Sequence, residues 1–150
     1  MLYDVMKKTR ENKELTQKQL SDILGVGRST YAGWENGIDT IPLYRLNDLC
    51  NYLDISLDYI CDISNNKKHN HLLKRSINSV KIGEKLRTIR IANKHTQAKT
   101  SKLIHTSQSN YSRYERGKNL ISTALIIAFS KHYNVSIDYL CGKKKDSNII

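Results

Sequence analysis

Residues 16–37 read TQKQLSDILGVGRSTYAGWENG, and this stretch decides the fold. Thr16 and the glutamine three residues later have the spacing of a capping box, which begins a helix. Apolar side chains then recur at the i, i+3 and i+4 spacing of one helical face, at Leu20, Ile23 and Leu24. Gly25 suits the position just after a helix end. The stretch therefore predicts a helix ending before Gly25, a three-residue turn, and a second short helix closed by Gly37.

Further helical patterns flank this stretch. Before it, one helical face carries Leu2, Met6 and Thr9. After it, Pro42 suits the first turn of a helix whose apolar face carries Leu43, Leu46, Leu49 and Leu53. Ser56 then caps a last short helix that runs through Ile60. Five short helices in the first 62 residues predict a compact all-α domain.

The chain is a repeat of itself. A shift of 80 residues aligns its halves without a gap and gives 13 identities between residues 2–62 and 82–142. The pairs are Arg10/Arg90, Thr16/Thr96, Gln17/Gln97, Ser21/Ser101, Ser29/Ser109, Tyr31/Tyr111, Glu35/Glu115, Gly37/Gly117, Ile41/Ile121, Ser56/Ser136, Asp58/Asp138, Tyr59/Tyr139 and Cys61/Cys141. A single register held over sixty residues indicates two similar domains in tandem.

Composition sets the expected domain boundaries. We expect domains over residues 1–62 and 80–142, a polar basic linker over 63–79, and a basic, frayed tail over 143–150. If the linker is flexible, its root-mean-square reach is about 20–25 Å.

The second repeat departs from the first at two core positions. Leu20 becomes Thr100, which removes apolar area from the core, and Gly25 becomes His105, which pays a left-handed backbone penalty that glycine avoids. We therefore expect the second domain to be less stable alone.

The net charge favours a polyanionic partner. The 150 residues carry 25 Lys and Arg against 14 Asp and Glu, a formal charge of +11. The charge is unevenly distributed, with −3 on residues 1–62, +4 on 63–79, +8 on 80–142 and +2 on the tail. We expect the second domain and the linker to supply most of the non-specific affinity, while the first domain adds selectivity or a protein contact.

Several classes of protein are disfavoured. The single proline and seven glycines argue against sandwiches and barrels. No apolar run approaches the roughly 20 residues of a membrane span, and the N-terminus lacks a signal-peptide core, so we expect a cytoplasmic protein without a membrane partner. The sequence has no Gly-rich phosphate loop, HExxH motif or convincing catalytic Ser/His/Asp spacing, so we expect no enzyme.

The cysteines and histidines indicate no cofactor or metal. Cys50, Cys61 and Cys141 have no CxxC spacing, which disfavours a disulfide framework and a structural zinc site. His69 and His71 lie close together in the polar linker, where we prefer a solvated segment to a metal site.

Two segments of the sequence resemble a known family. The pattern T-Q-x-x-L-S-x-x-L-G-V-x-x-S-T-Y-x-x-W-E-N-G over residues 16–37 resembles the Cro and phage-repressor (XRE) class of helix-turn-helix domains. The segment Ile55-Ser56-x-Asp58-Tyr59-Ile60 is similar to that family's closing V-S-x-D-x-L. The resemblance covers nearly all of residues 1–62 and, more weakly, 82–142. It implies two tandem five-helix lambda-repressor-like helix-turn-helix domains that bind double-stranded DNA.

The resemblance also implies roles for individual residues. Base-reading roles fall on Arg28, Ser29, Gly33, Gln108, Ser109, Ser112 and Arg113. Phosphate-binding roles fall on Gln17, Gln97, Arg116 and Lys118. Structural ion pairs that join the first helix to the recognition helix fall on Arg10 with Glu35 and on Arg90 with Glu115. For any single basic residue the alternative is an ordinary solvated side chain.

The chemistry of the side chains fits these roles. Arg28 can chelate guanine and is the one residue of the first recognition helix with a strong base preference. In the second, Gln108 suits adenine, and Arg113 suits guanine or a phosphate. Asn36 and Ile38 replace Arg116 and Lys118 in the first repeat and cannot supply charge.

Two functions from different classes fit these observations. The first is a sequence-specific DNA-binding transcriptional regulator, a repressor of bacterial or phage type, in which one chain with two recognition helices imitates a dimer. The alternative is a protein-binding module on the same fold, antitoxin-like or a phage-encoded inhibitor, which the acidic first domain keeps open. A homodimer and a protein partner of the first domain remain open, and the orientation of the half-sites is not fixed by the sequence.

Overall fold

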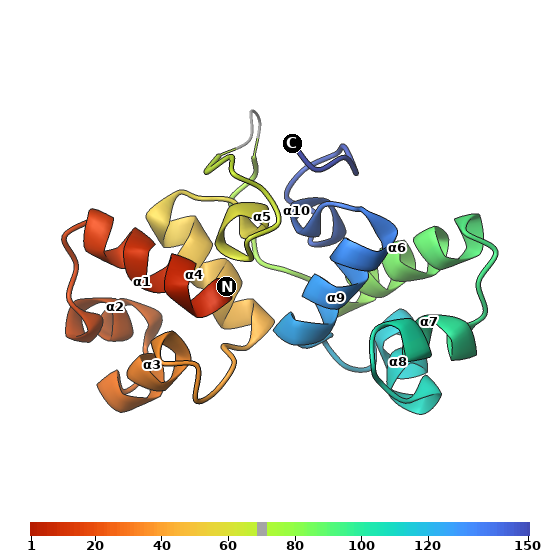
Figure 1. Ribbon diagram of the computed structural model, residues 1–150, viewed down its shortest axis with the longest axis horizontal. Helices are drawn as coiled ribbons and strands as arrows, with labels where there is room; N and C mark the ends of the chain where they lie inside the picture. Colours follow the sequence, from red (N-terminus) through yellow and green to blue (C-terminus); the bar gives the residue numbers. More distant parts are fainter. Residues whose placement is uncertain (69–71) are drawn as a thin grey trace.

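The computed structural model describes residues 1–68 and 72–150, so His69 and His71 lie outside the described residues (Figure 1). The described residues form ten α-helices and no strand, which confirms the predicted all-α fold. The first domain contains α1 (Leu2–Asn12), α2 (Gln17–Leu24), α3 (Arg28–Glu35), α4 (Leu43–Leu53) and α5 (Leu57–Ile60). The second contains α6 (Ser79–Ala92), α7 (Gln97–Leu103), α8 (Gln108–Glu115), α9 (Thr123–Tyr133) and α10 (Ile137–Leu140).

The helix boundaries follow from the predicted capping residues. The Thr16 hydroxyl accepts a hydrogen bond from the Gln19 amide at 3.1 Å, and the Gln19 side chain accepts one from the Thr16 amide at 2.8 Å. This reciprocal pair satisfies two amides that a helix start leaves without partners. Gly25 ends α2 with a φ of +70°, a conformation that glycine adopts without steric cost. In the second domain the same position is His105 at φ +63°, which confirms the predicted left-handed backbone.

The core of the second domain contains a polar cluster that the first domain lacks. The Thr100 and Tyr133 hydroxyls lie 2.8 Å apart, and the Tyr133 hydroxyl lies 2.8 Å from Nδ1 of His95. The equivalent residues in the first domain are three leucines, at positions 15, 20 and 53. The loss of apolar area at Thr100 is therefore accompanied by a hydrogen bond to Tyr133 that satisfies its buried hydroxyl.

The first helix of each domain approaches its recognition helix differently. A Cβ atom added at Gly83 of α6 would lie 2.4 Å from the backbone oxygen of Tyr114 and 2.5 Å from that of Glu115. The equivalent residue in α1 is Tyr3, whose ring lies 3.4 Å from the Cβ position of Gly37. Glycine therefore allows α6 to contact the C-terminal end of α8 backbone to backbone.

The two domains contact each other through their closing helices (Figure 1). The amides of Leu57 and Asp58 both donate to the Asp138 carboxylate at 2.9 Å. In return, the amide of Ile137 donates to Oδ1 of Asp58 at 2.6 Å, and the Ser136 hydroxyl donates to Oδ2 at 2.5 Å. We call this arrangement the Asp58–Asp138 clasp. Asp58 accepts from Ile137, and its repeat equivalent Asp138 accepts from Leu57, the repeat equivalent of Ile137. The contact therefore has the reciprocity of a two-fold axis.

A second contact joins the domains near the starts of α4 and α9. The Thr123 hydroxyl donates to the backbone oxygen of Ile41 at 2.6 Å. Residues 40–44 and 120–124, which are related by the shift of 80, line the two sides of this contact. The two-fold relation therefore extends from the clasp to the opposite end of the domain interface.

The C-terminal tail is not frayed. The Ser136 amide donates to the backbone oxygen of Ser147 at 2.8 Å, and the Ser56 amide donates to that of Lys67 at 2.7 Å. These two bonds are again related by a shift of 80, so the structural repeat continues beyond the closing helices. Lys143 and Lys144 are buried, since only 1% and 7% of their surfaces are exposed. The sequence reads as a basic tail because backbone hydrogen bonds, rather than apolar side chains, hold this segment in place.

The linker is tied to both domains where the structure describes it. The side-chain amides of Asn47 and Asn51 on α4 donate to the backbone oxygen of Arg75 at 2.8 and 3.3 Å. The Leu73 amide donates to the backbone oxygen of Lys143 at 2.8 Å. These hydrogen bonds hold the described part of the linker against both domains, so it is not a freely flexible connection. No helix in the two described ranges is long and apolar enough to cross a membrane.

Candidate nucleic-acid interface

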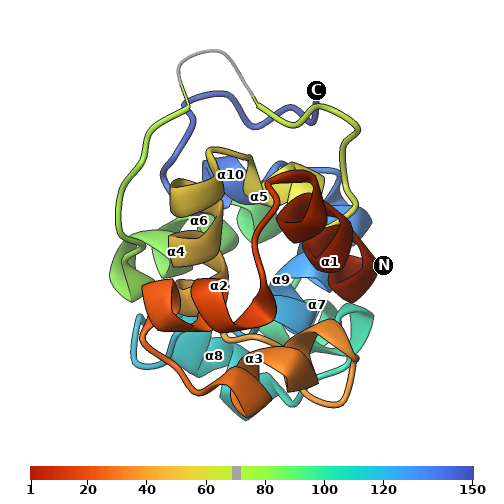
Figure 2. The same ribbon diagram turned by 90° about the vertical axis from the view of Figure 1, so that its left-hand side faces the viewer.

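The two recognition helices lie on one edge of the molecule. In Figure 1, α3 and α8 lie at the bottom, while α5 and α10 lie toward the top. Figure 2, turned by 90°, again places α3 and α8 together at the bottom edge. The two-fold relation of the domains thus presents both helices to the same side, next to α2 and α7.

Most of the predicted base-reading side chains are accessible at this edge. Arg28 and Ser29, at the N-terminal end of α3, and Gln108 and Ser109, at that of α8, are exposed. Side chains at the start of a recognition helix are the ones that reach base edges in the major groove. The start of α8 is fixed by Ser107, whose hydroxyl accepts a hydrogen bond from the Asn110 amide at 3.1 Å.

Gly33 is the exception among these residues. It is buried, and a Cβ atom added there would lie 3.7 Å from the carboxylate of Asp39. The backbone oxygen of Gly33 also accepts from the amides of Ile38 and Asp39, at 3.0 and 3.3 Å. The loop after α3 therefore covers this glycine, and we remove Gly33 from the expected base-reading surface.

The far ends of the two recognition helices differ in charge. The repeat equivalents of Gly33 and Asp39 are Arg113 and Asn119. Arg113 is exposed, and its Nη2 lies 3.5 Å from Oδ1 of Asn119, while Ser112 before it is half-buried. A cation therefore occupies the second domain where a carboxylate occupies the first, and only the cation attracts a phosphate backbone.

A buried ion pair fixes each recognition helix to the first helix of its domain. Arg10 donates to the Glu35 carboxylate from Nε at 2.7 Å and from Nη2 at 3.1 Å. Tyr31 and Gln17 also donate to Glu35, both at 2.9 Å. Although burial alone raises the pKa of Glu35, hydrogen bonds from Arg10, Gln17 and Tyr31 bring it below its ordinary value. The carboxylate is thus charged and holds α1, α2 and α3 in one arrangement.

The second domain contains the same pair. Arg90 donates to Glu115 from Nε at 2.7 Å and from Nη2 at 2.9 Å, and Gln97 donates to Glu115 at 3.2 Å. Burial raises the pKa of Glu115, and the hydrogen bond from Arg90 contributes most to the opposite, net lowering. In both domains the structure therefore has the ion pair that the sequence predicts.

The residues predicted to bind phosphate occupy two kinds of position. Gln17 and Gln97 are half-buried at the first turns of α2 and α7, where one amide hydrogen bond is already given to the ion-pair glutamate. Arg116 and Lys118 are exposed in the loop after α8. The Nε of Arg116 donates to the backbone oxygen of Ser112 at 3.4 Å, which directs this side chain along α8.

Reasoning from the sequence missed Asp39. When the two repeats are aligned, Asp39 pairs with Asn119. This difference in charge beside the recognition helix is the signal that the sequence contains. That signal gains meaning only when the loop is seen to fold over Gly33.

Comparisons with known proteins point to one family. The family model described as helix-turn-helix matches the chain twice, over residues 6–60 and 86–140. The uncharacterized HTH-type transcriptional regulator YqaE of Bacillus subtilis (strain 168) is 37% identical over 68 residues, covering 45% of this chain and 59% of the relative. The uncharacterized HTH-type transcriptional regulator YobD of the same organism is 32% identical over 59 residues, covering 39% and 53%. The chain therefore spans less than two thirds of either relative. No solved structure matches the chain.

Proposed function

This chain belongs to the helix-turn-helix family, and from that membership we propose that it is a transcriptional regulator that binds double-stranded DNA sequence-specifically. The family is not one of enzymes, in agreement with the sequence. The observation that carries the proposal is the placement of two recognition helices on one edge, each with exposed polar side chains at its N-terminal end. That arrangement suits insertion into two successive major grooves of one duplex.

The proposed binding site is an inverted repeat with unlike halves. The reciprocal contacts of the clasp relate the recognition helices by a two-fold axis, which supports inverted rather than direct half-sites. The halves differ because α3 offers Arg28 where α8 offers Gln108. Arginine chelates guanine and glutamine pairs with adenine, so each half-site has its own preferred base.

The two domains divide the work unequally in this proposal. The second domain has a net charge of +8 against −3 for the first, and its cations Arg113, Arg116 and Lys118 are exposed on α8 and the loop after it. It therefore supplies most of the salt-dependent affinity, while the first domain adds base selectivity. We further propose repression as the regulatory outcome, since occupancy of a promoter alone excludes a polymerase.

Selection of the full chain on a random duplex library tests this function. We expect enrichment of two different half-sites in inverted orientation, with centres about one helical turn apart or a multiple of it. Affinity for the winner should exceed that for a scrambled duplex at every salt concentration. Failure to enrich any sequence, with only weak salt-sensitive binding, would overturn the proposal.

A protein-binding role is the second candidate. The observation that favours it is the acidic first domain, with the Asp39 carboxylate beside its recognition helix, because a carboxylate there repels DNA and attracts a basic protein surface. Loss of sequence-dependent duplex binding, together with a partner retained by the full chain through a purification, would support this role over DNA reading.

A further inference from the structure

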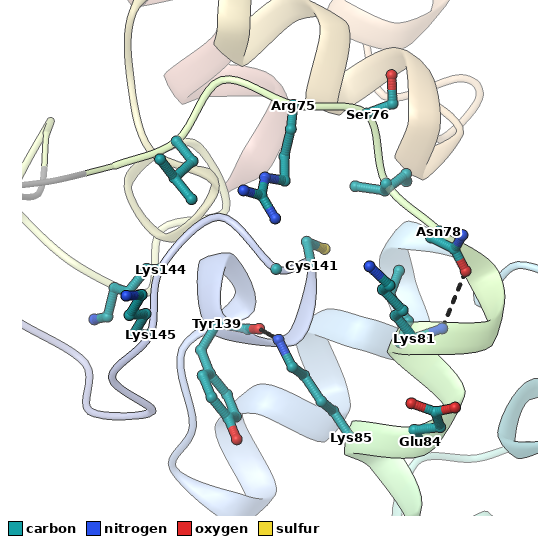
Figure 3. Close-up of a pocket in the computed structure, with 14 residues that line it drawn as sticks. Arg75, Ser76, Asn78, Lys81, Glu84, Lys85, Tyr139, Cys141, Lys144 and Lys145 are labelled. Carbon is teal, nitrogen blue, oxygen red and sulfur yellow. Dashed lines mark hydrogen bonds between the residues drawn. The ribbon is translucent and has the colours of Figure 1, made fainter.

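A cavity of about 690 Å³ lies between the linker, α6, α10 and the tail (Figure 3). Its volume falls in the range of about 300–1,000 Å³ that is typical of small-molecule sites. It belongs to neither recognition helix and has no role in the function proposed above.

Cations dominate the lining of this cavity. In Figure 3, Arg75 of the linker and Lys81 of α6 extend toward the same space, with Lys85 beside them. Lys144 and Lys145 line another part of the wall, and Glu84 is the one acidic residue among the described residues that line it. A multiply charged anion would relieve the repulsion among these side chains.

The pKa of Lys85 is affected by the neighbouring cations of the cavity. Its Nζ donates to the backbone oxygen of Tyr139 at 2.7 Å and lies 4.6 Å from the centre of the Tyr139 ring. Burial lowers the pKa of Lys85, and the charges of Arg75 and Lys81 lower it further. An anion placed among the three would favour the charged form of Lys85.

Part of the remaining lining is apolar, beside the polar residues Ser76 and Asn78. The apolar part includes Leu73, Ile77, Ile82 and Tyr139. An apolar wall beside a cationic one suits a ligand with both an organic body and a charged group. A free mineral anion would leave that wall without a partner.

The position of the cavity argues against a contact with the duplex bound by α3 and α8. Its lining comes from α10, the first turns of α6 and the linker, and α10 lies toward the edge opposite the recognition helices in Figures 1 and 2. We propose that this cavity is a binding site for a small organic phosphate, with Arg75, Lys81 and Lys85 holding the phosphate oxygens.

The cavity is also connected to the first domain. The backbone oxygen of Arg75 accepts hydrogen bonds from Asn47 and Asn51 of α4, while the Arg75 side chain lines the cavity. A ligand that engages Arg75 therefore contacts the segment that joins the domains.

Calorimetric titration of the full chain with inorganic pyrophosphate, a probe of the charged wall, tests the site. We expect the double variant Lys81→Gln/Lys85→Gln to weaken pyrophosphate binding by about tenfold or more. The matched control Lys7→Gln/Lys131→Gln removes the same charge at exposed positions on α1 and α9 and should change the affinity by less than about twofold. An equal loss in both variants, or no binding by the native chain, would overturn the proposal.

Two further measurements keep the test decisive. Lys85→Gln removes the hydrogen bond to Tyr139, so the single variant Arg75→Gln, at an exposed linker position, provides a change that leaves this bond intact. It should also weaken pyrophosphate binding severalfold without lowering the melting temperature. The duplex affinities of Lys81→Gln/Lys85→Gln and of its control should be equal. A larger loss of duplex affinity in the cavity variant would identify the cavity as a nucleic-acid contact and overturn the small-molecule site.

Discussion

Asp58 and Asp138 each accept hydrogen bonds from the first turn of the helix that carries the other. The two carboxyls lie 80 residues apart in the sequence and are buried side by side at the domain interface. Helix starts favour negative charge, but two charges so close together repel. The clasp is therefore a point where the domain interface responds to protonation.

Stability should fall as pH rises through the titration of Asp58. Burial raises the pKa of the Asp58 carboxyl, and the neighbouring Asp138 raises it further. Between the unfolded value of about 3.9 and this raised value, the folded chain binds more protons than the unfolded chain. The contribution of Asp58 to the free energy of unfolding therefore decreases with pH across that window and is level above it.

The variant Asp58→Asn isolates this effect, because its amide resembles a protonated carboxyl. Urea unfolding at a series of pH values should give a native-minus-variant difference that declines with pH and then levels off. Glu35 and Glu115, with lowered pKa values, act in the opposite direction in both proteins and cancel in the difference. Parallel stability curves for the native chain and the variant would show that folding leaves the pKa of Asp58 unchanged, which contradicts the prediction.

Gly83→Ala should destabilise the second domain although alanine is the better helix former. Its Cβ atom would lie 2.4 Å from a backbone oxygen of α8, so the two helices must separate. We expect a loss of about 1–3 kcal/mol. Gly33→Ala in α3 is the matched control, since its Cβ atom meets the nearest neighbour at 3.7 Å. The control should be neutral or stabilising by up to about 1 kcal/mol, and equal effects of the two alanines would refute the close approach.

Thr100→Val should cost about 1 kcal/mol, because it removes the hydroxyl that lies 2.8 Å from the Tyr133 hydroxyl. The same change made together with Tyr133→Phe should cost less, since the partner hydroxyl is then already gone. Denaturant unfolding of the two single variants and the double variant measures this coupling. Strictly additive free energies would contradict a hydrogen bond between Thr100 and Tyr133.

Arg28→Ala and Gln108→Ala should each relax one half-site only. A bidentate contact between a side chain and a base discriminates by about 1–3 kcal/mol. Repeating the duplex selection with each variant should therefore randomise one position in one half-site and leave the other half-site intact. Simultaneous loss of both half-sites in either variant would argue against independent reading by α3 and α8.

Asp39→Asn should strengthen duplex binding severalfold at low salt, because it removes a carboxylate beside α3 and matches the Asn119 of the second domain. The gain should shrink as salt screens the duplex charge. Asp62→Asn makes the same charge change beside α5, on the edge away from the recognition helices, and should have little effect. An equal gain from both substitutions would mean that only net charge matters.

The sequence predicts local structure well because local structure has local causes. The helix starts follow from Thr16 and Ser56, and the end of α2 follows from Gly25, each acting on a neighbour within a few residues. The two ion pairs are also predictable, since both partners recur in both repeats.

The remaining features depend on contacts between distant segments. Asp58 and Asp138 stand out in the alignment as identities, but nothing in the sequence indicates that each binds the other's helix. The burial of Lys143 also depends on contacts between distant segments. The sequence does not predict it, because lysine ordinarily indicates a solvated surface. Thr100 is similar, since its partner Tyr133 lies 33 residues away.

The clasp has a further consequence for the way the proposed regulator would respond to its own abundance. In a homodimer, the two-headed reader forms only when two chains meet. When the subunit is scarce, promoter occupancy therefore rises with the square of the subunit concentration. In the proposed regulator the second half is covalently present, so occupancy by single chains would rise with the first power of chain concentration. Covalent union also frees each half to accumulate changes alone, as at Gly83 and Thr100, whereas a homodimer expresses every mutation twice. Asymmetric operators thus become accessible without competing self-paired assemblies.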